Sequence, residues 1–176
     1  LDMDGWVEIM HKEQAQSPTS GAVVVLALAE SQGADILAAS TELKTLADLK
    51  GRSIGLDTDF YLFFLHTVLE STGLDLDDVT VHPMGQYDDL SPFMDGRWDA
   101  VVTYGDYEDA ATSDQADRIY TLASTRDFPM TMVEVLTLRT SVLQAHPEAA
   151  QKLAEAWYEA VDWCRAHPAE ARTIMS

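Results

Sequence analysis

Two pairs of closely spaced carboxylates are the residues whose types and spacing come nearest to acid–base chemistry. Asp57 with Asp59, and Asp88 with Asp89, could in principle supply a general acid and a general base. The chain carries 30 acidic residues against 11 basic ones, a formal net charge of −19, so neighbouring surface acids are expected throughout it. The pairs therefore do not by themselves predict an enzyme.

The residues that commonly hold metals or act as nucleophiles show no reactive pattern either. Cys164 is the single cysteine, which excludes an internal disulfide and a cysteine-based metal cage. The sequence has no glycine-rich phosphate loop and no nucleophile elbow. The five histidines, three of which directly precede proline, share no metal-ligand spacing; they are His11, His66, His82, His146 and His167. The sequence predicts a protein that is not an enzyme and needs no metal and no cofactor.

The charge balance and the apolar runs limit the partners. Phosphate binding needs clustered Lys and Arg, whereas four Lys are scattered along this chain, so we expect no nucleic-acid partner. The longest apolar stretch, Ala22 to Ala29, is too short to cross a bilayer, and no stable membrane insertion is expected. An Asp-rich, Lys-poor surface suits concentrated salt, since screening removes its self-repulsion. A halophilic source is therefore one hypothesis, and an ordinary acidic secreted protein is the other.

The elements that must position any site alternate between short apolar strands and helices. Apolar runs bounded by turn residues predict strands over residues 22–29, 35–39, 53–56, 79–82, 98–103, 119–123 and 132–139. Helical spacing, with glycine or proline at the ends, predicts helices over residues 46–50, 59–71, 87–94, 105–111, 148–166 and 169–175. This alternation predicts an α/β fold with mainly parallel sheets flanked by helices on both faces.

Three segments then resemble a known family, in the family's own order. Thr45–Gly55, TLADLKGRSIG, is similar to the stretch that opens the second lobe of type II periplasmic binding proteins. Gly96–Tyr104 resembles a later strand of that lobe, and His146–Ala171 resembles the C-terminal helices. The nearest branch is the group that binds nitrate, sulfonates, taurine and thiamine precursors. The resemblance implies the two-lobed type II fold.

The resemblance also implies a domain organisation. Residues 1–40 would be the remainder of lobe 1 and the first crossover, residues 41–130 lobe 2, and residues 131–176 the return crossover and C-terminal helices packing on lobe 1. Asp4-Gly5-Trp6 is similar to the family element where the chain reaches the cleft. The N-terminal part of lobe 1 would then precede Leu1, and we expect this chain to lie within a longer protein. A partner chain or a domain swap is the alternative way to complete the lobe.

The candidate ligand-binding residues follow from this mapping. Ligands of such folds lie outside the carboxyl ends of parallel strands, where loops and helix N-termini present unpaired N–H groups. Structural roles remain open beside each candidate: Thr58 and Asp59 are also ordinary helix caps, and Tyr61 could be the first buried residue of its helix. Ser31 and Asp35 could equally stabilise a turn. The full set is Trp6, Glu8, Ser31, Asp35, Thr58, Asp59, Tyr61, Tyr104, Asp106 and Glu134.

The function implied by the resemblance is capture and delivery. We expect an extracytoplasmic protein, periplasmic or extracellular and with lipid anchoring as an option, that holds a small polar or nitrogenous molecule between two lobes. Its partner would be the permease of an ABC transporter. The alternatives are a ligand-sensing domain of a larger receptor and a thiamine-pyrimidine-synthase-like enzyme, whose His- and Cys-rich motifs are absent here.

The charge of the mapped loops indicates the ligand's charge. Acidic residues predominate in these loops, and Lys12 and Arg126 are the nearby exceptions. Because carboxylates in a low-dielectric crevice repel an anion, the loops predict a cationic, zwitterionic or neutral nitrogenous ligand. Aromatic rings for stacking or cation–π contact would come from Trp6, Tyr61, Tyr104 and Tyr107.

Overall fold

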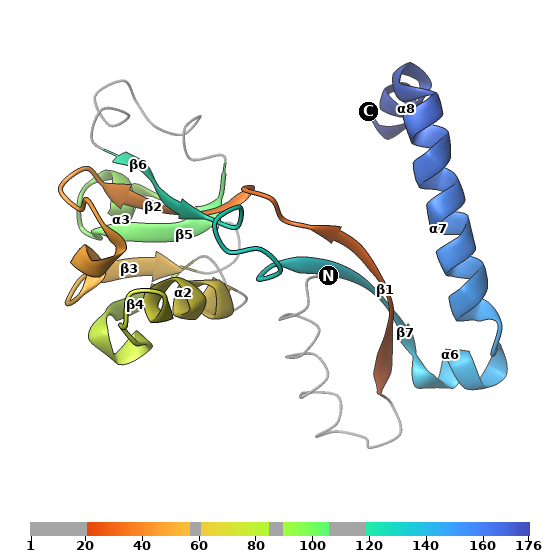
Figure 1. The fold of residues 1–176 in the computed structure, drawn as a ribbon, viewed down its shortest axis with the longest axis horizontal. Coiled ribbons are helices and arrows are strands. Elements are labelled where there is room, and N and C mark those ends of the chain that lie inside the picture. The colour runs from red at the N-terminus through yellow and green to blue at the C-terminus, as the bar shows by residue number, and fades with distance from the viewer. Residues whose placement is uncertain (1–20, 57–60, 85–89, 106–118) are drawn as a thin grey trace. The chain divides into compact units, whose positions relative to one another are not determined.

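The computed structural model describes residues 21–56, 61–84, 90–105 and 119–176 (Figure 1). These residues divide into two compact units. Unit 1 contains Ala29–Glu134, and unit 2 contains the described part of the chain up to Leu28 together with Val135–Ser176.

Unit 1 is built on a five-stranded sheet. In chain order its strands are β2 (Asp35–Ser40), β3 (Ser53–Leu56), β4 (Thr80–Pro83), β5 (Ala100–Tyr104) and β6 (Ile119–Ser124). Their spatial order is β4-β3-β5-β2-β6. β3 runs parallel to β4 and to β5, whereas β2 is antiparallel to both β5 and β6. Four strands therefore point in one direction and β2 in the other, which gives a mainly parallel sheet.

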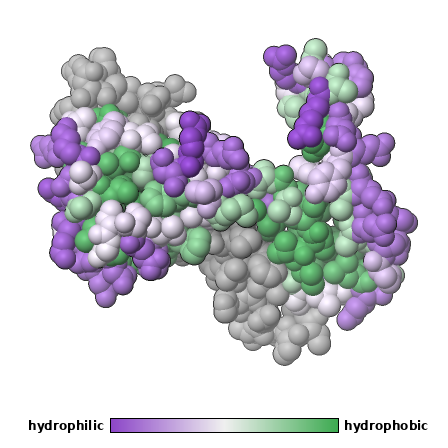
Figure 2. Space-filling model, viewed as in Figure 1, coloured by the Kyte–Doolittle hydropathy of each residue, from purple (hydrophilic) through white to green (hydrophobic). Residues whose placement is uncertain are grey.

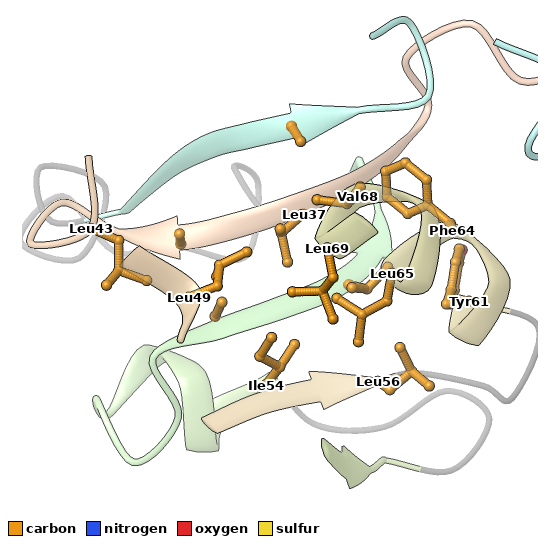
Figure 3. Packing of buried hydrophobic residues seen from close by; sticks show 14 of the residues in the cluster. Leu37, Leu43, Leu49, Ile54, Leu56, Tyr61, Phe64, Leu65, Val68 and Leu69 are labelled. Atoms are coloured by element: carbon orange, nitrogen blue, oxygen red, sulfur yellow. The ribbon is translucent and has the colours of Figure 1, made fainter. Parts of the chain in front are cut away.

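One face of this sheet is covered by helix α2 (Tyr61–Glu70). The buried side chains of α2 recur at helical spacing, so one stripe of the helix faces the strands. Phe64, with no exposed surface, packs edge-to-face on Phe128 at a ring distance of 6.2 Å. Figure 3 shows the α2 side chains pointing toward strand residues of the same core. They include Tyr61, Phe64, Leu65, Val68 and Leu69 from α2, and Leu37, Ile54 and Leu56 from the strands.

The opposite face of the sheet is buried by a second, smaller cluster. Residues of β2 alternate between the faces: Leu37 joins the α2 cluster, and Ile36 joins the other. Phe93, from the short helix α3 (Ser91–Met94), packs in this second cluster together with Val101 of β5. The predicted α/β class, with a mainly parallel sheet flanked on both faces, is confirmed in this unit.

Among the described residues of unit 1, two further one-turn helices precede strands. The 3-10 helix η1 (Leu46–Leu49) leads to β3, and η2 (Leu76–Asp78) leads to β4. The carboxylate of Asp48 accepts hydrogen bonds from the backbone N–H groups of Lys44 and Thr45, both at 2.8 Å, and so caps the start of η1. Gly51 ends this turn at a φ of 75°, the left-handed region that favours glycine.

The described part of unit 2 contains three helices and the larger part of a two-stranded sheet. The sheet pairs β1 (Ala22–Glu30) with β7 (Val133–Arg139), and the boundary between the units falls within both strands. Figure 2 shows hydrophobic side chains gathered over these strands. The chain continues through helices α6 (Thr140–Ala145), α7 (Ala149–Ala166) and α8 (Pro168–Met175).

That the C-terminal helices pack on lobe 1 stays a prediction, and the long helix α7 agrees with its prediction in extent. None of its residues is buried, and the side chains of Leu153 and Trp157 are 40% and 38% exposed. Cys164 is half-buried. The domain boundaries predicted at residues 40 and 130 stay predictions. β2, which lies before the predicted boundary at residue 40, belongs to the same sheet as the strands that follow that boundary.

Candidate functional site

The candidate site lies at one edge of the unit 1 sheet. β5 ends at Tyr104, which pairs with Asp35, the first residue of β2. Across the other side of β2, Ser124 at the end of β6 pairs with Ile36. The carboxyl ends of β5 and β6 thus meet the start of β2, at the edge where α/β sheets receive ligands.

The centre of this edge is a buried carboxylate. Asp35 is 6% exposed, and its Oδ1 accepts a hydrogen bond of 2.9 Å from the phenolic hydroxyl of Tyr61. Tyr61 is the first residue of α2 and is 8% exposed, so the alternative that it begins the buried stripe of its helix is correct. The bond therefore ties α2 to the edge of the sheet. No described Lys or Arg forms an ion pair with Asp35.

A cluster of hydroxyl groups lies beside Asp35. The Oγ of Ser31 and the Oγ1 of Thr125 are 2.8 Å apart, and Thr125 also accepts from the N–H of Gly33 at 2.9 Å. The N–H of Thr125 donates to the carbonyl of Asp35 at 3.0 Å, and the N–H of Asp35 donates to the Oγ of Ser31 at 3.3 Å. These bonds hold the turn before β2 against the chain that leaves β6, so Ser31 and Asp35 do stabilise a turn.

A guanidinium lies against the same turn. Gly33 has a φ of 104°, and a Cβ placed on it would be 3.4 Å from both Nε and Nη2 of Arg126. Nη2 of Arg126 is also 3.4 Å from the carbonyl oxygen of Gln32, to which it donates. Arg126 is exposed, so its positive charge is available to solvent at this edge. Tyr104, 56% exposed, presents its ring there as well.

The structure thus brings four of the predicted site residues together: Ser31, Asp35, Tyr61 and Tyr104. Glu134 lies on β7 and is exposed, and no contact joins it to Asp35 among the described residues. The other five candidates lie outside the described residues, and their roles stay predictions. They are Trp6, Glu8, Thr58, Asp59 and Asp106.

Thr125 is the residue of this edge that sequence reasoning missed. It directly follows β6 and is 1% exposed. The rule that marked the loop after Tyr104 applies equally to the end of β6, so the signal was present. What the sequence does not reveal is that β6 lies beside β2, which brings Thr125 to Ser31 and Asp35.

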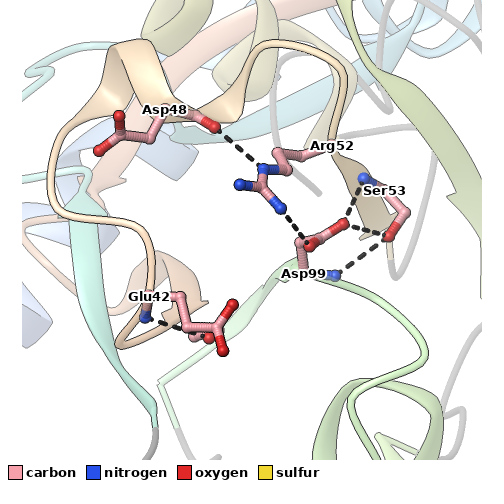
Figure 4. A network of polar contacts seen from close by, with 6 residues as sticks. Glu42, Asp48, Arg52, Ser53 and Asp99 are labelled. Carbon is pink, nitrogen blue, oxygen red and sulfur yellow. Dashed lines mark hydrogen bonds and ion pairs between the residues drawn. The ribbon is translucent and has the colours of Figure 1, made fainter.

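A different polar network holds the opposite edge, where β3 and β5 begin (Figure 4). Nη1 of Arg52 is 3.2 Å from Oδ1 of Asp99, and Oδ2 of Asp99 accepts from the N–H and the hydroxyl of Ser53 at 2.9 and 2.7 Å. Burial alone would raise the pKa of Asp99, but the hydrogen bonds from Ser53 and the charge of Arg52 together hold it below its ordinary value of 3.8. Two of the segments that resemble family motifs, Thr45–Gly55 and Gly96–Tyr104, are therefore hydrogen-bonded to each other where β3 and β5 begin.

A pocket of about 450 Å³ opens near this network. It is lined by residues such as Ser40 at the end of β2, Asp99 before β5 and Ile119 at the start of β6, together with Trp98 and Phe93. Parallel strands of α/β sheets bind ligands at their carboxyl ends, whereas this pocket lies where β5 and β6 begin. We therefore place the candidate site at the Asp35 edge and not in this pocket.

Two kinds of feature are absent from the part of the chain that the structure describes. No group of three or more His, Cys, Asp or Glu side chains is arranged to hold a metal ion. No helix is both long enough and apolar enough to cross a membrane.

The family comparison covers most of the chain. Residues 19–171 match the family model described as NMT1/THI5 like. A Brucella abortus (strain 2308) protein that carries the name of a binding protein is 27% identical over 163 residues, which are 90% of this chain and 50% of that protein. The chain thus spans about half the length of the curated relatives it matches.

Solved structures share the fold at low sequence identity. The periplasmic aliphatic sulphonate binding protein SsuA from Escherichia coli superposes with a TM-score of 0.68 and 19% identity, covering 92% of this chain and 55% of SsuA. The desulfurization enzyme DszB superposes with a TM-score of 0.62 and 16% identity, covering 92% and 61%. At these identities the likeness shows the fold alone, and the predicted type II periplasmic-binding-protein fold is confirmed.

Proposed function

The chain belongs to the NMT1/THI5-like family, and from that membership we propose that it acts in an extracytoplasmic solute-binding protein. In this proposal the protein captures a small polar or nitrogenous molecule between two lobes and delivers it to an ABC importer. It converts nothing chemically.

The observation that carries the proposal is the gathering of polar groups at one sheet edge. Ser31, Asp35, Tyr61 and Thr125 come from three segments that are far apart in the sequence, and each is connected to another by a hydrogen bond. A hydrogen-bonded set of this kind holds its members in fixed positions, which is what selective recognition of a small polar molecule requires. The names of the sequence relative and of SsuA, both binding proteins, support the same role.

One feature of the chain suits a protein that closes on its ligand. The unit boundary lies within β1 and β7, so the two units are connected by a pair of strands. A small change of backbone angles in such connecting strands is a common way for two lobes to close. We propose that bending of β1 and β7 accompanies ligand capture, and that the closed form is what the permease recognises.

The proposed location and partner follow from the relatives. SsuA is described as periplasmic, and this supports a periplasmic or extracellular location for our protein, with lipid anchoring as an option. DszB shows that the same fold can carry an enzyme. We nevertheless propose a binding role, because neighbouring carboxylates are expected in a chain with a net charge of −19 and the five histidines share no metal-ligand spacing in the sequence.

Native mass spectrometry of freshly purified protein tests the proposal. A tight binder often keeps its ligand through purification, so we expect a non-covalent adduct of small-molecule mass that disappears on denaturation and returns when the released fraction is added back. The released compound should be chemically unchanged after prolonged incubation. Conversion of that compound by catalytic amounts of the protein would show an enzyme instead of a capture protein.

A further inference from the structure

We propose that Asp35 is the acceptor for a positively charged nitrogen group of the ligand. The ligand class would then be compounds that carry an ammonium, an amidinium or a protonated ring nitrogen, including zwitterions. This inference rests on the proposed binding function and names the chemistry that the Asp35 edge selects.

The side chain of Asp35 has fewer hydrogen-bond donors than a carboxylate can accept. The residue is only 6% exposed, and Oδ1 has one neutral donor, the hydroxyl of Tyr61. Within the described residues no donor reaches Oδ2. A buried carboxylate has about four acceptor positions and is costly to leave without donors or a counter-charge. The site is therefore completed by a group from outside the described protein.

The neighbouring polar groups are already engaged with one another. The hydroxyls of Ser31 and Thr125 lie 2.8 Å apart, and Thr125 also accepts from Gly33. Arg126 is held against the turn by the carbonyl of Gln32 and forms no ion pair with Asp35. None of these described groups supplies a second donor to Asp35, and we assign that donor to the ligand.

Asp35 differs from the other acids of this edge. Oε1 of Glu30 accepts the backbone N–H of Met130 at 2.7 Å. Oδ2 of Asp127 accepts both the N–H and the hydroxyl of Ser124, at 2.9 and 3.0 Å. Both carboxylates accept hydrogen bonds from backbone N–H groups, and Asp127 is exposed and Glu30 half-buried, whereas Asp35 is buried. The general negative charge of the chain thus does not account for the role we assign to Asp35.

Isothermal titration of the full chain with matched probe pairs tests the inference. Each pair keeps one scaffold and changes only the nitrogen group: taurine against 2-hydroxyethanesulfonate, benzamidine against benzamide, and ethanolamine against ethylene glycol. We expect at least one nitrogen cation to bind roughly ten- to a hundredfold more tightly than its neutral-ended partner. This difference in affinity is typical of one charge-assisted hydrogen bond. Nitrate and ethanesulfonate serve as anionic controls that carry no ammonium, amidinium or protonated ring nitrogen.

Variants then assign the preference to Asp35. Asp35→Asn keeps the shape and removes the charge, and it should abolish the preference for the cation within each binding pair. Tyr61→Phe removes the donor to Oδ1 but not the charge, and Asp127→Asn removes one charge from the same edge; both should keep the preference. If Asp35→Asn does not fold, the affinities of the wild type for the two members of each pair decide whether the site prefers a nitrogen cation.

The outcomes separate the inference from the proposed function. Tight binding of nitrate or ethanesulfonate, unchanged or strengthened in Asp35→Asn, overturns the inference and leaves the capture function standing. A cation preference that survives Asp35→Asn also overturns it. Failure of every probe to bind, cationic and anionic alike, counts against both.

Discussion

The indole of Trp98 occupies the space that a side chain at Gly55 would need. A Cβ on Gly55 would come within 2.4 Å of Cε3 and 2.6 Å of Cζ3 of Trp98, and within 3.0 Å of the Met84 sulfur. Gly55 pairs with His82 across β3 and β4, and the Trp98 ring is stacked on the His82 ring at 5.6 Å. Trp98 therefore lies against the parallel pair β3 and β4 at Gly55 and His82.

This contact predicts that Gly55→Ala destabilises the protein by about 1–3 kcal/mol, the usual cost of overpacking a filled site. Urea unfolding followed by circular dichroism measures the change. In the double variant with Trp98→Leu, the smaller side chain should relieve the clash, so the combined loss should be less than the sum of the single losses. Strict additivity would contradict the contact.

Two adjacent phenylalanines on α2 provide a matched test of the core. Phe64 has no exposed surface and packs on Phe128, whereas Phe63 is 50% exposed. Phe64→Ala should lower the free energy of unfolding by about 3–5 kcal/mol, because it leaves a cavity in the α2 cluster. Phe63→Ala should change it by less than about 1 kcal/mol. Equal losses in the two variants would mean that α2 presents a different face to the sheet.

The lowered pKa of Asp99 predicts how stability depends on pH. A group whose pKa is lower in the folded state stabilises the fold above its unfolded pKa, near 3.8, and this contribution is lost as pH falls through the folded pKa. At pH 7 the melting temperature of Asp99→Asn should be lower than that of the wild type. The difference between the two melting temperatures should become smaller below pH 3.8. Thermal melts from pH 7 to pH 2.5 measure this. Asp95→Asn, which removes an exposed acid paired with Arg97 at 3.8 Å, should show little gap at any pH.

The net charge of −19 predicts stabilisation by salt. Like charges on one surface repel each other, and the screening length falls from about 10 Å at 0.1 M salt to about 3 Å at 1 M. We expect the melting temperature to rise steadily from low to molar potassium chloride. A melting temperature that stays flat over this range rules out the halophilic interpretation.

Much of the fold was predictable because its signals are local. Apolar runs between turn residues predicted β1 and β2, and the proline and spacing pattern predicted α7 to within one residue. α6 was missed, since Arg139 precedes it without a capping side chain and the helix is only six residues long. β4 begins one residue later than predicted, at Thr80. The order of strands in the sheet depends on long-range pairing, which no local pattern contains.

The same distinction applies to the candidate site. Ser31 and Asp35 were predicted because they flank a glycine turn before a strand, which is a local signal. The bond from Tyr61 to Asp35 and the contact of Thr125 with Ser31 depend on the packing of α2 and β6 around β2. Composition predicted an acidic edge, but only the structure shows that Asp35 is buried while Glu30 and Asp127 are bonded to backbone.

Binding without conversion is the central claim, and a thermal-shift screen tests it most directly. The full chain is first unfolded, dialysed and refolded to remove any resident ligand, and then melted with a chemically diverse set of small polar and nitrogenous compounds. At least one compound should raise the melting temperature with the logarithm of its concentration, by an amount that corresponds to about 2.7 kcal/mol at a hundred times its Kd, and should be recovered unchanged. Thr125→Val, which removes the hydroxyl that joins Ser31 to Gly33, should weaken that shift. A screen in which no compound stabilises the refolded wild type, or in which the stabilising compound is consumed, would contradict the account.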